Sequence, residues 1–189
     1  MSEDKAAERQ GEAPARRFLI ERVYLKDLSF ESPRPLETLG RPWSEPARLS
    51  MQVGAGHQAA GDGRWEVTLT VTVTAERGEG DKAQVLYLVE VKQAGLFQLE
   101  GFDEDERLAL LNAHCPQILY PYAREVVSAM ADRGGFPQLL LAPVDFQALY
   151  RQHLAPHLKQ KLAEAQAAEG GGAGGEPAAA SAPDAEPSS

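Results

Sequence analysis

The sequence predicts an α+β fold in which helices cover one face of an antiparallel sheet. Strand patterns occupy the first part of the chain, helical patterns occupy the last third, and glycine-rich turns separate consecutive strands. A run of strands followed by a run of helices is typical of α+β domains. We therefore expect a four-stranded antiparallel sheet with C-terminal helices packed on it.

The strongest strand pattern lies at residues 64–74, where Trp65 and the following valines and leucine alternate with polar side chains. Glycine turns at residues 61–63 and 78–81 predict hairpins on either side of it. Weaker patterns predict the other strands at residues 18–30, 48–53 and 85–93. In the first of these, we expect one face to carry Phe18, Ile20, Tyr24, Leu28 and Phe30.

Residues 32–46 connect the first two strands and contain four prolines, which prevent regular strand pairing. This crossing segment also carries Leu36, Leu39 and Trp43, so part of it must pack on something. After the strands, helical patterns predict three helices, at residues 103–113, 122–133 and 145–163, with Pro116 and Pro121 constraining the start of the second.

Composition predicts one folded domain at residues 18–162 between two polar tails. Residues 1–17 carry four acids and four bases, and residues 163–189 are rich in Ala, Gly and Pro with five acids and no base. Such segments cannot bury enough apolar surface to offset the entropy lost on ordering, so we expect both tails to be disordered. The net charge of −9 then leaves −4 on the folded part.

The sequence argues against several classes of partner. Nucleic-acid binding requires a concentrated Lys/Arg footprint, and no basic cluster is present. No apolar run approaches the length of a membrane span, and the N-terminus lacks the apolar core of a signal peptide. We therefore expect a cytoplasmic protein that does not insert into membranes, and we expect no cofactor.

The sequence also gives little support for catalysis, and we expect no enzyme activity. His153 and His157 have the spacing of metal ligands on a helix, but Pro156 lies between them and no catalytic acid accompanies them. Cys115 follows His114, yet sequence neighbours rarely have the geometry of a nucleophile and its base. The glycine turns lack the phosphate-loop pattern, so we expect neither a metal site nor a nucleotide site.

The loop between the last two predicted helices is apolar where a connector is normally polar. Residues 134–141 read GGFPQLLL, which places four large apolar side chains on a loop. These side chains either close over the core as a lid or, together with Leu36 and Trp43 of the crossing segment, line a groove for apolar material. The sequence pattern leaves these two interpretations open.

Several runs of residues resemble the SecB-type protein-export chaperones. Residues 18–31 (FLIERVYLKDLSFE) resemble the first strand of that family, and Trp43 resembles the tryptophan of its crossover loop. VTVTA at 71–75 and VEVKQAGLF at 89–97 resemble its central strands, with Ala94 where the family often has glycine. Short matching runs follow in the same order: CP at 115–116, PYARE at 121–125, FPQL at 136–139 and LAPV-F at 141–146.

This resemblance implies a homotetramer, assembled as a dimer of dimers, that holds unfolded precursor polypeptides without ATP and passes them to the translocase motor SecA. It implies a client groove lined by Trp43, Phe136, Pro137 and Leu139, to which the residue pattern adds Leu36 and Leu39. It also implies that an acidic surface contacts SecA, at positions that match Asp27, Glu31, Leu88 and Glu90.

Two alternative functions remain open at this point. One is a SecB-like chaperone dedicated to a toxin–antitoxin pair, and the other is a small-ligand-binding α+β domain whose apolar loop caps a pocket. The second predicts convergent polar groups around the pocket, and the sequence offers none. The tail after Gln160 is longer and less acidic than is typical of the family, so a second SecA contact there is not expected to follow the family pattern.

Overall fold

The computed structural model describes residues 15–40, 47–78, 80 and 83–153. The chain divides into two units, 1–150 and 151–189, and only residues 151–153 of the second unit are described. Apart from residues 151–153, which are helical, every element named below lies in the first unit. The predicted tails fall almost entirely outside the described residues, so the predicted domain limits stay a prediction.

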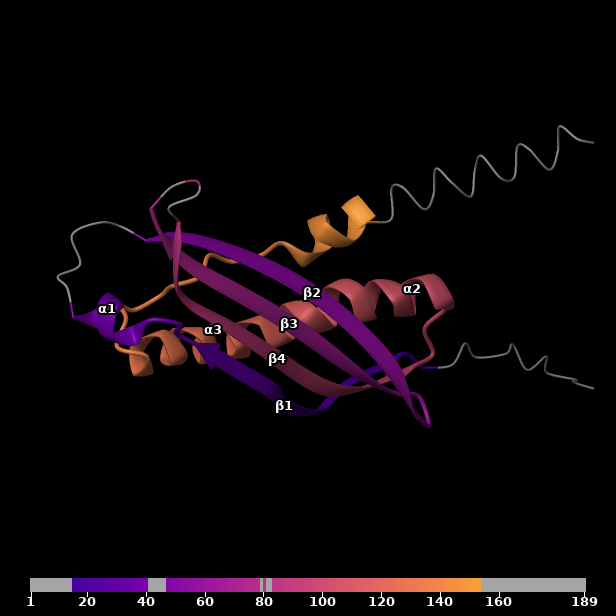
Figure 1. The fold of residues 1–189 in the computed structure, drawn as a ribbon. Helices are drawn as coiled ribbons and strands as arrows, with labels where there is room; N and C mark the ends of the chain where they lie inside the picture. The colour runs from indigo at the N-terminus through magenta and orange to yellow at the C-terminus, as the bar shows by residue number, and fades with distance from the viewer. Residues whose placement is uncertain (1–14, 41–46, 79, 81–82, 154–189) are drawn as a thin grey trace, which may run out of the picture. The chain divides into compact units, whose positions relative to one another are not determined.

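Four antiparallel strands form one sheet in the order β1-β4-β3-β2 (Figure 1). This confirms the predicted sheet. Both β2 and β4 extend beyond their predicted ends. Their glycines and alanines have low strand propensity, but pairing with β3 supplies backbone hydrogen bonds that hold them in the strand conformation. The strand bounds are β1 (Arg17–Glu31), β2 (Arg48–Gly61), β3 (Arg64–Arg77) and β4 (Gln84–Glu100).

The hairpin between β2 and β3 is confirmed at Gly61–Gly63. All three turn residues have positive φ, at 81° for Gly61, 52° for Asp62 and 71° for Gly63. Two-residue hairpin loops favour this conformation because its twist matches that of the flanking strands, and glycine adopts it without a steric penalty. The tight turn fixes the register of β3 against its neighbour β2.

The helical part departs from the prediction at the start of its main helix. A capping box at Asp103 and Glu106 opens α2, and helical backbone then continues through a π-helical turn, η2, into α3. Pro121 lies inside α3 rather than at its start, so the predicted boundary at residue 122 is wrong. The helical bounds are α1 (Pro35–Leu39), α2 (Glu104–Ala109), η2 (Leu110–His114) and α3 (Cys115–Arg133), and residues 146–153 are also helical.

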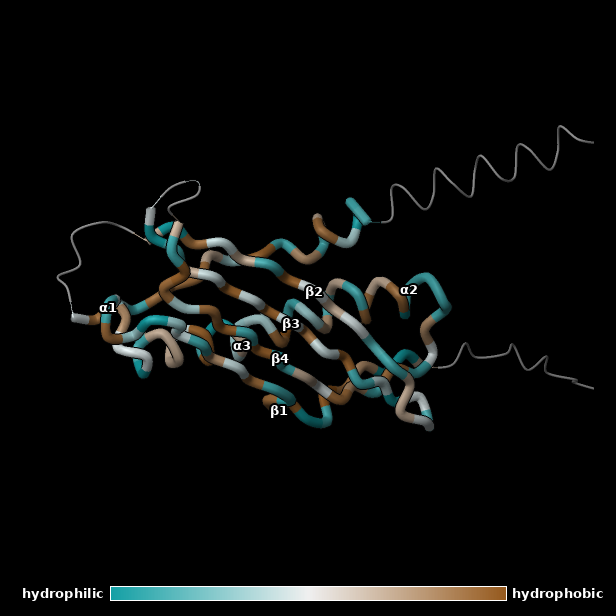
Figure 2. The backbone as a smooth tube through the Cα atoms, in the orientation of Figure 1, coloured by the Kyte–Doolittle hydropathy of each residue, from teal (hydrophilic) through white to brown (hydrophobic). Residues whose placement is uncertain are grey.

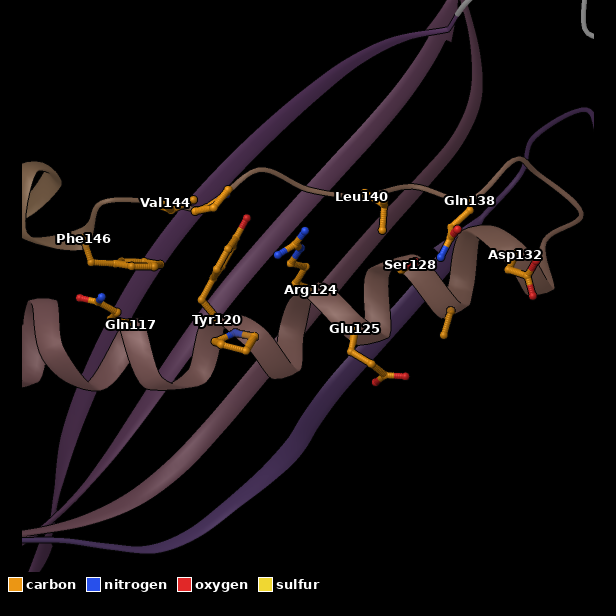
Figure 3. A pocket seen from close by; sticks show the side chains of 13 residues that line it. Gln117, Tyr120, Arg124, Glu125, Ser128, Asp132, Gln138, Leu140, Val144 and Phe146 are labelled. Carbon is orange, nitrogen blue, oxygen red and sulfur yellow. The ribbon is translucent and has the colours of Figure 1, made fainter.

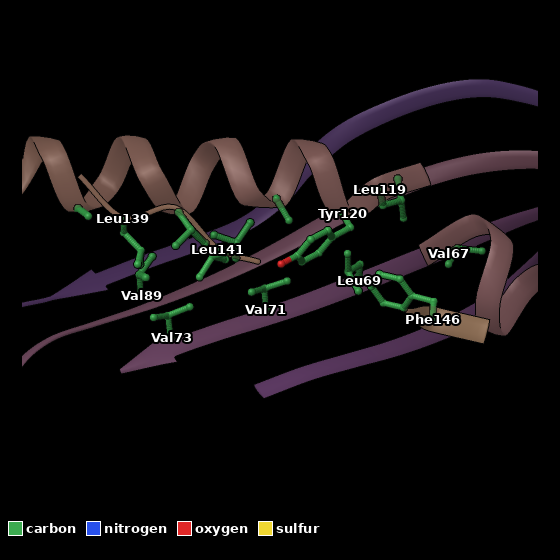
Figure 4. Packing of buried hydrophobic residues seen from close by; sticks show 14 of the residues in the cluster. Val67, Leu69, Val71, Val73, Val89, Leu119, Tyr120, Leu139, Leu141 and Phe146 are labelled. Carbon is green, nitrogen blue, oxygen red and sulfur yellow. The ribbon is translucent and has the colours of Figure 1, made fainter. Parts of the chain in front are cut away.

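Tertiary packing explains how α3 tolerates a proline. The helix lies across β3 and β4 (Figure 1), and Figure 4 shows Leu119 on its side facing the sheet. The buried stripe of the helix also includes Ala123 and Val127. A proline inside a helix removes one backbone hydrogen bond, but the burial of this stripe stabilises the helix through the proline. The inner face of β3 supplies the opposing layer with Val67, Leu69, Val71 and Val73, all fully buried.

Figure 2 shows the alternation of hydrophobic and more polar residues along the strands that face this layer. The helices cover one face only, which we call the inner face. Side chains of opposite parity on β3 and β4 lie on the other face, which we call the outer face. The fold therefore has two layers, and the outer face of the sheet has no helix on it among the described residues.

Two bulges in β1 correct the predicted face of that strand. The pairing of β1 with β4 shifts between Ile20 and Arg22 and again between Leu25 and Asp27. Each extra residue reverses the alternation of side chains. Tyr24 therefore lies on the outer face opposite Ala94, while Val23 and Leu25 lie on the inner face, contrary to the predicted pattern.

The end of α3 is fixed by a close approach between Gly134 and an aromatic cluster. A Cβ atom at Gly134 would come within 2.9 Å of Phe30 Cε1 and 3.0 Å of Phe136 Cδ2. The Phe136 ring centroid lies 4.6 Å from that of Tyr87 and 6.3 Å from that of Phe30. Residue 134 must be glycine for Phe136 to reach this position between the helix end and the sheet.

We expect Gly134→Ala to destabilise the protein by about 1–3 kcal/mol, because the new methyl group must push Phe30 and Phe136 out of a packed cluster. Urea unfolding followed by far-UV circular dichroism measures the change. Gly54→Ala is the matched control, because nothing lies within 4 Å of its Cβ position. Equal midpoints for the two variants would show that the cluster tolerates the extra volume.

Candidate functional site

The apolar loop after α3 alternates between the core and the surface. Phe136, Leu139 and Leu141 are buried in the hydrophobic core, and Figure 4 shows the two leucines between α3 and the sheet. The side chains between them point outward, and Leu140 is 67% exposed. Pro137 is also exposed. The loop therefore closes the core on one side and presents an apolar surface on the other.

This arrangement corrects part of the predicted groove. Phe136 is 3% exposed and Leu139 is 6% exposed, so neither side chain is open to solvent in this chain. Their apolar area is used in packing against Tyr87 and the inner face of the sheet. For Phe136 and Leu139 the structure supports the first of the two interpretations, a lid on the core, and a groove on the outward side of the loop stays a prediction.

The described part of the crossing segment, residues 32–40, approaches this loop at Leu39. Leu39 contacts Gly135, where a Cβ atom would be 3.4 Å from Leu39 Cδ1. Leu39 is 42% exposed and Leu36 is 91% exposed. Pro35 opens α1 with its fixed φ, so the leucines sit on a short helix rather than on the irregular chain that the prolines predicted. Trp43, the other predicted residue of this segment, lies outside the described residues.

A hollow of about 870 Å³ lies between α3 and the outward side of the loop (Figure 3). Its apolar wall is formed by Tyr120, Leu140, Val144 and Phe146. Tyr120 is held in place because its hydroxyl donates a hydrogen bond to the carbonyl oxygen of Ala142 at 2.5 Å. The long polar side chains of Arg124, Asp132 and Gln138 line the remainder of the hollow.

This hollow was not predicted from the sequence. Its residues come from a helix and a loop that are separated by up to 29 positions, from Gln117 to Phe146. The sequence did carry one indication of it. Successive side chains of an extended segment point to opposite sides, so the three consecutive leucines of the loop could not all face the core. Leu140 is the leucine that faces outward.

The four residues of the predicted acidic surface lie together on the outer face. Glu31 pairs with Leu88, Ser29 pairs with Glu90, and Asp27 pairs with Lys92 on the neighbouring strands β1 and β4. The sequence could not establish that these strands are neighbours. With the pairing known, we define the acidic surface as Asp27, Glu31, Leu88 and Glu90.

Lys92 lies within the acidic surface and was not predicted. Its Nζ atom is 2.9 Å from Asp27 Oδ2 and 3.3 Å from Glu90 Oε1. The hydrogen bond and the positive charge of Lys92 lower the pKa of Asp27, and the two carboxylates in turn raise the pKa of Lys92. Asp27 and Lys92 are therefore both charged at neutral pH.

A second polar cluster crosses the outer face farther along the sheet. Glu66 of β3 accepts hydrogen bonds from the Tyr24 hydroxyl, from Lys26 Nζ at 2.8 Å and from Gln58 Nε2 at 2.5 Å. The hydrogen bond to Glu66 is the main cause that raises the pKa of Tyr24 to about 12. Tyr24 pairs with Ala94, so a small side chain on β4 leaves room for β1 side chains to reach β3.

The groups considered for catalysis have no catalytic geometry. Cys115 is fully buried, and burial raises the pKa of its thiol to about 12. The ring of His114 packs against Phe18 at a centroid distance of 5.1 Å. Among the described residues no cluster of three or more His, Cys, Asp and Glu side chains could hold a metal ion, and His157 lies outside them.

No helix within the described residues is both long and apolar enough to span a membrane. Among the described residues, the polar side chains that line the hollow form no hydrogen-bond network with one another, unlike the convergent polar groups that hold a small ligand. What the described surface offers is therefore apolar area on the helix side and a charged patch on the outer face.

Comparison with known proteins identifies relatives over most of the chain. A family model described as preprotein translocase subunit SecB matches residues 11–157. The protein-export protein SecB of Alkalilimnicola ehrlichii is 43% identical over 169 residues, which make up 89% of this chain and 86% of that protein. The protein of the same name from Halorhodospira halophila is 45% identical over 136 residues, or 72% of this chain and 75% of the relative.

A solved structure supports the fold. The chain matches a SecB-like chaperone of Mycobacterium tuberculosis, solved in complex with an antitoxin peptide, with a TM-score of 0.55 over 68% of this chain and 91% of that one. The two sequences are 19% identical, so this likeness concerns the fold alone.

We expect the Cys115 thiol to be unreactive toward a thiol reagent such as DTNB at pH 8 while the protein is folded. The pKa of about 12 leaves very little thiolate at this pH, and the side chain is fully buried. Absorbance at 412 nm follows the reaction, and the same protein in 6 M guanidinium chloride is the control and should react fully. Rapid modification of the folded protein would contradict the buried placement.

Proposed function

This chain belongs to the SecB family of preprotein translocase subunits, and on this basis we propose that it is a chaperone in protein export that holds unfolded precursor proteins without ATP. The observation that carries the proposal is the family match, together with the exposed apolar surface of α1 and of the loop after α3. The relatives at 43% and 45% identity are named protein-export proteins, which favours export over a role devoted to one toxin–antitoxin pair.

We propose that clients bind to the apolar surface formed by Leu36, Leu39, Pro137 and Leu140, and that this surface continues into the hollow beside α3. Phe136 and Leu139 lie beneath it and give it a rigid floor. Trp43 is proposed as a further contact from its place in the sequence. Each large apolar side chain that a client covers contributes roughly 1.5–3 kcal/mol before ordering costs, so one groove binds weakly and with little sequence preference.

Weak binding at one groove becomes strong when one long client occupies several grooves. We propose a homotetramer, a dimer of dimers, for this reason. The edge strand β1 supports self-association, because the backbone N–H and C=O groups on its free edge have no partner strand within the described part of the chain. It also exposes large apolar side chains along its length, at Leu19, Ile20 and Leu25.

We propose that the acidic surface on the outer face binds SecA, the motor that receives the client. Asp27, Glu31 and Glu90 supply negative charge around Leu88, which suits a partner that is basic at its rim and apolar at its centre. The client surface lies on the helix side of the sheet. A client and SecA therefore do not compete for the same area.

The remaining parts of the proposal follow from the sequence. We place the protein in the cytoplasm, where export clients are made, and we assign it no cofactor and no enzyme activity. The polar segments 1–17 and 163–189 are proposed to be tails outside the chaperone domain at 18–162.

We expect Leu36→Ser to weaken the binding of an unfolded client by about fivefold, since one exposed leucine contributes about 1 kcal/mol to a contact after ordering costs. Isothermal titration calorimetry with a reduced and alkylated client protein measures the affinity. Leu36→Met is the matched control, because it keeps the apolar area, and light scattering checks that the assembly is unchanged. An affinity equal to that of the wild type would remove α1 from the client surface.

We expect the double charge reversal Asp27→Lys and Glu31→Lys to weaken SecA binding by about tenfold or more at low salt, because it turns attraction to a basic partner into repulsion. Surface plasmon resonance with immobilised SecA measures this, and the variant should still prevent aggregation of an unfolded client. If SecA binding is unaffected while client binding is intact, the contact lies elsewhere on the molecule.

A further inference from the structure

Lys92 is a positive charge at the centre of a surface that is otherwise acidic. We propose that Lys92 limits the affinity of the acidic surface for its partner and reduces the salt dependence of that affinity. This inference rests on the proposed contact between the acidic surface and SecA. It concerns a residue of this chain that the resemblance to the family did not single out.

The geometry places Lys92 between the two strands that carry the acids. Its ammonium group bridges Asp27 of β1, at 2.9 Å, and Glu90 of β4, at 3.3 Å. The other residues paired with Lys92 and Glu90 on this face are uncharged. Thr70 pairs with Lys92, and Ser29 and Thr72 pair with Glu90. Lys92 thus offsets one of the three negative charges of the acidic surface, and nothing in these paired positions offsets the others.

The acids are held in place by other groups as well. Asp27 Oδ1 accepts a hydrogen bond from the backbone N–H of Leu28 at 3.0 Å, and Glu90 Oε2 accepts one from the Thr72 hydroxyl at 3.3 Å. Removal of the ammonium group therefore leaves both carboxylates oriented. Replacement of Lys92 by a neutral residue therefore removes a positive charge and leaves the acidic side chains in place.

The solvent exposure of the two ion pairs of Lys92 indicates that this residue affects partner binding more than folding stability. The side chain of Lys92 is 38% exposed, and those of Asp27 and Glu90 are 56% and 35% exposed. Ion pairs this open to water contribute little to folding stability. A charge in this position instead changes the electrostatic field that an approaching basic partner meets, and that partner must compete with Lys92 for the same carboxylate oxygens.

The test is Lys92→Gln, with SecA binding measured by surface plasmon resonance from 50 mM to 500 mM salt. We expect binding about threefold tighter at 50 mM salt, a steeper decline of affinity with salt, and convergence with the wild type at 500 mM, where charges are screened within a few ångströms. Lys92→Arg keeps the charge and should bind as the wild type does.

Arg48→Gln is the matched control for net charge. Arg48 forms an exposed ion pair with Glu76 at 3.3 Å on β2, the edge strand opposite β1, and its loss changes the charge of the chain by the same amount. This variant should bind SecA as the wild type does. If Arg48→Gln tightens binding as much as Lys92→Gln, the effect belongs to the net charge of the molecule and the inference fails.

The outcome separates this inference from the proposed function. If the double reversal at Asp27 and Glu31 weakens SecA binding while Lys92→Gln leaves it unchanged or weaker, the acidic surface stands and the role of Lys92 is overturned. If the double reversal has no effect, the proposed surface itself is overturned. Tighter and more salt-sensitive binding by Lys92→Gln alone supports the inference.

Discussion

The packing of Phe136 against Phe30 and Tyr87 is the contact on which the rest of this structure depends. It ties the end of α3 to the inner face of the sheet, and it requires glycine at position 134. Once Phe136 is fixed, Leu139 and Leu141 follow it into the core and Leu140 must face outward. The position of one aromatic ring therefore determines which residues of the loop are available to bind a client.

The sheet separates two surfaces that have different chemistry. The inner face is apolar and carries α3, the loop and the proposed client surface. The outer face is polar and carries the cluster around Glu66 and the acidic surface with Lys92. A chaperone that passes its client to a motor needs both contacts at once, and one covered and one open face of the sheet keep the proposed client surface and the proposed SecA surface apart.

Much of the fold could be predicted because it depends on local patterns. The alternation along β3 and the glycine turn at Gly61–Gly63 identified a strand and a hairpin without reference to the rest of the chain. The face of β1 could not be predicted, because the bulges that place Tyr24 on the outer face arise from pairing with β4. The start of α3 was missed for a similar reason, since burial of Leu119 and Ala123 outweighs the local cost of Pro121.

By itself, the sequence determined the fold class, the family and the residue types available for binding, because all three are written in local periodicity and in runs of matching residues. Only the tertiary structure decided which of those residues are accessible and which are neighbours. It buried Phe136 and Leu139, exposed Leu140, and brought Asp27 next to Lys92. Burial and strand pairing are relations between distant segments, so no local pattern can specify them.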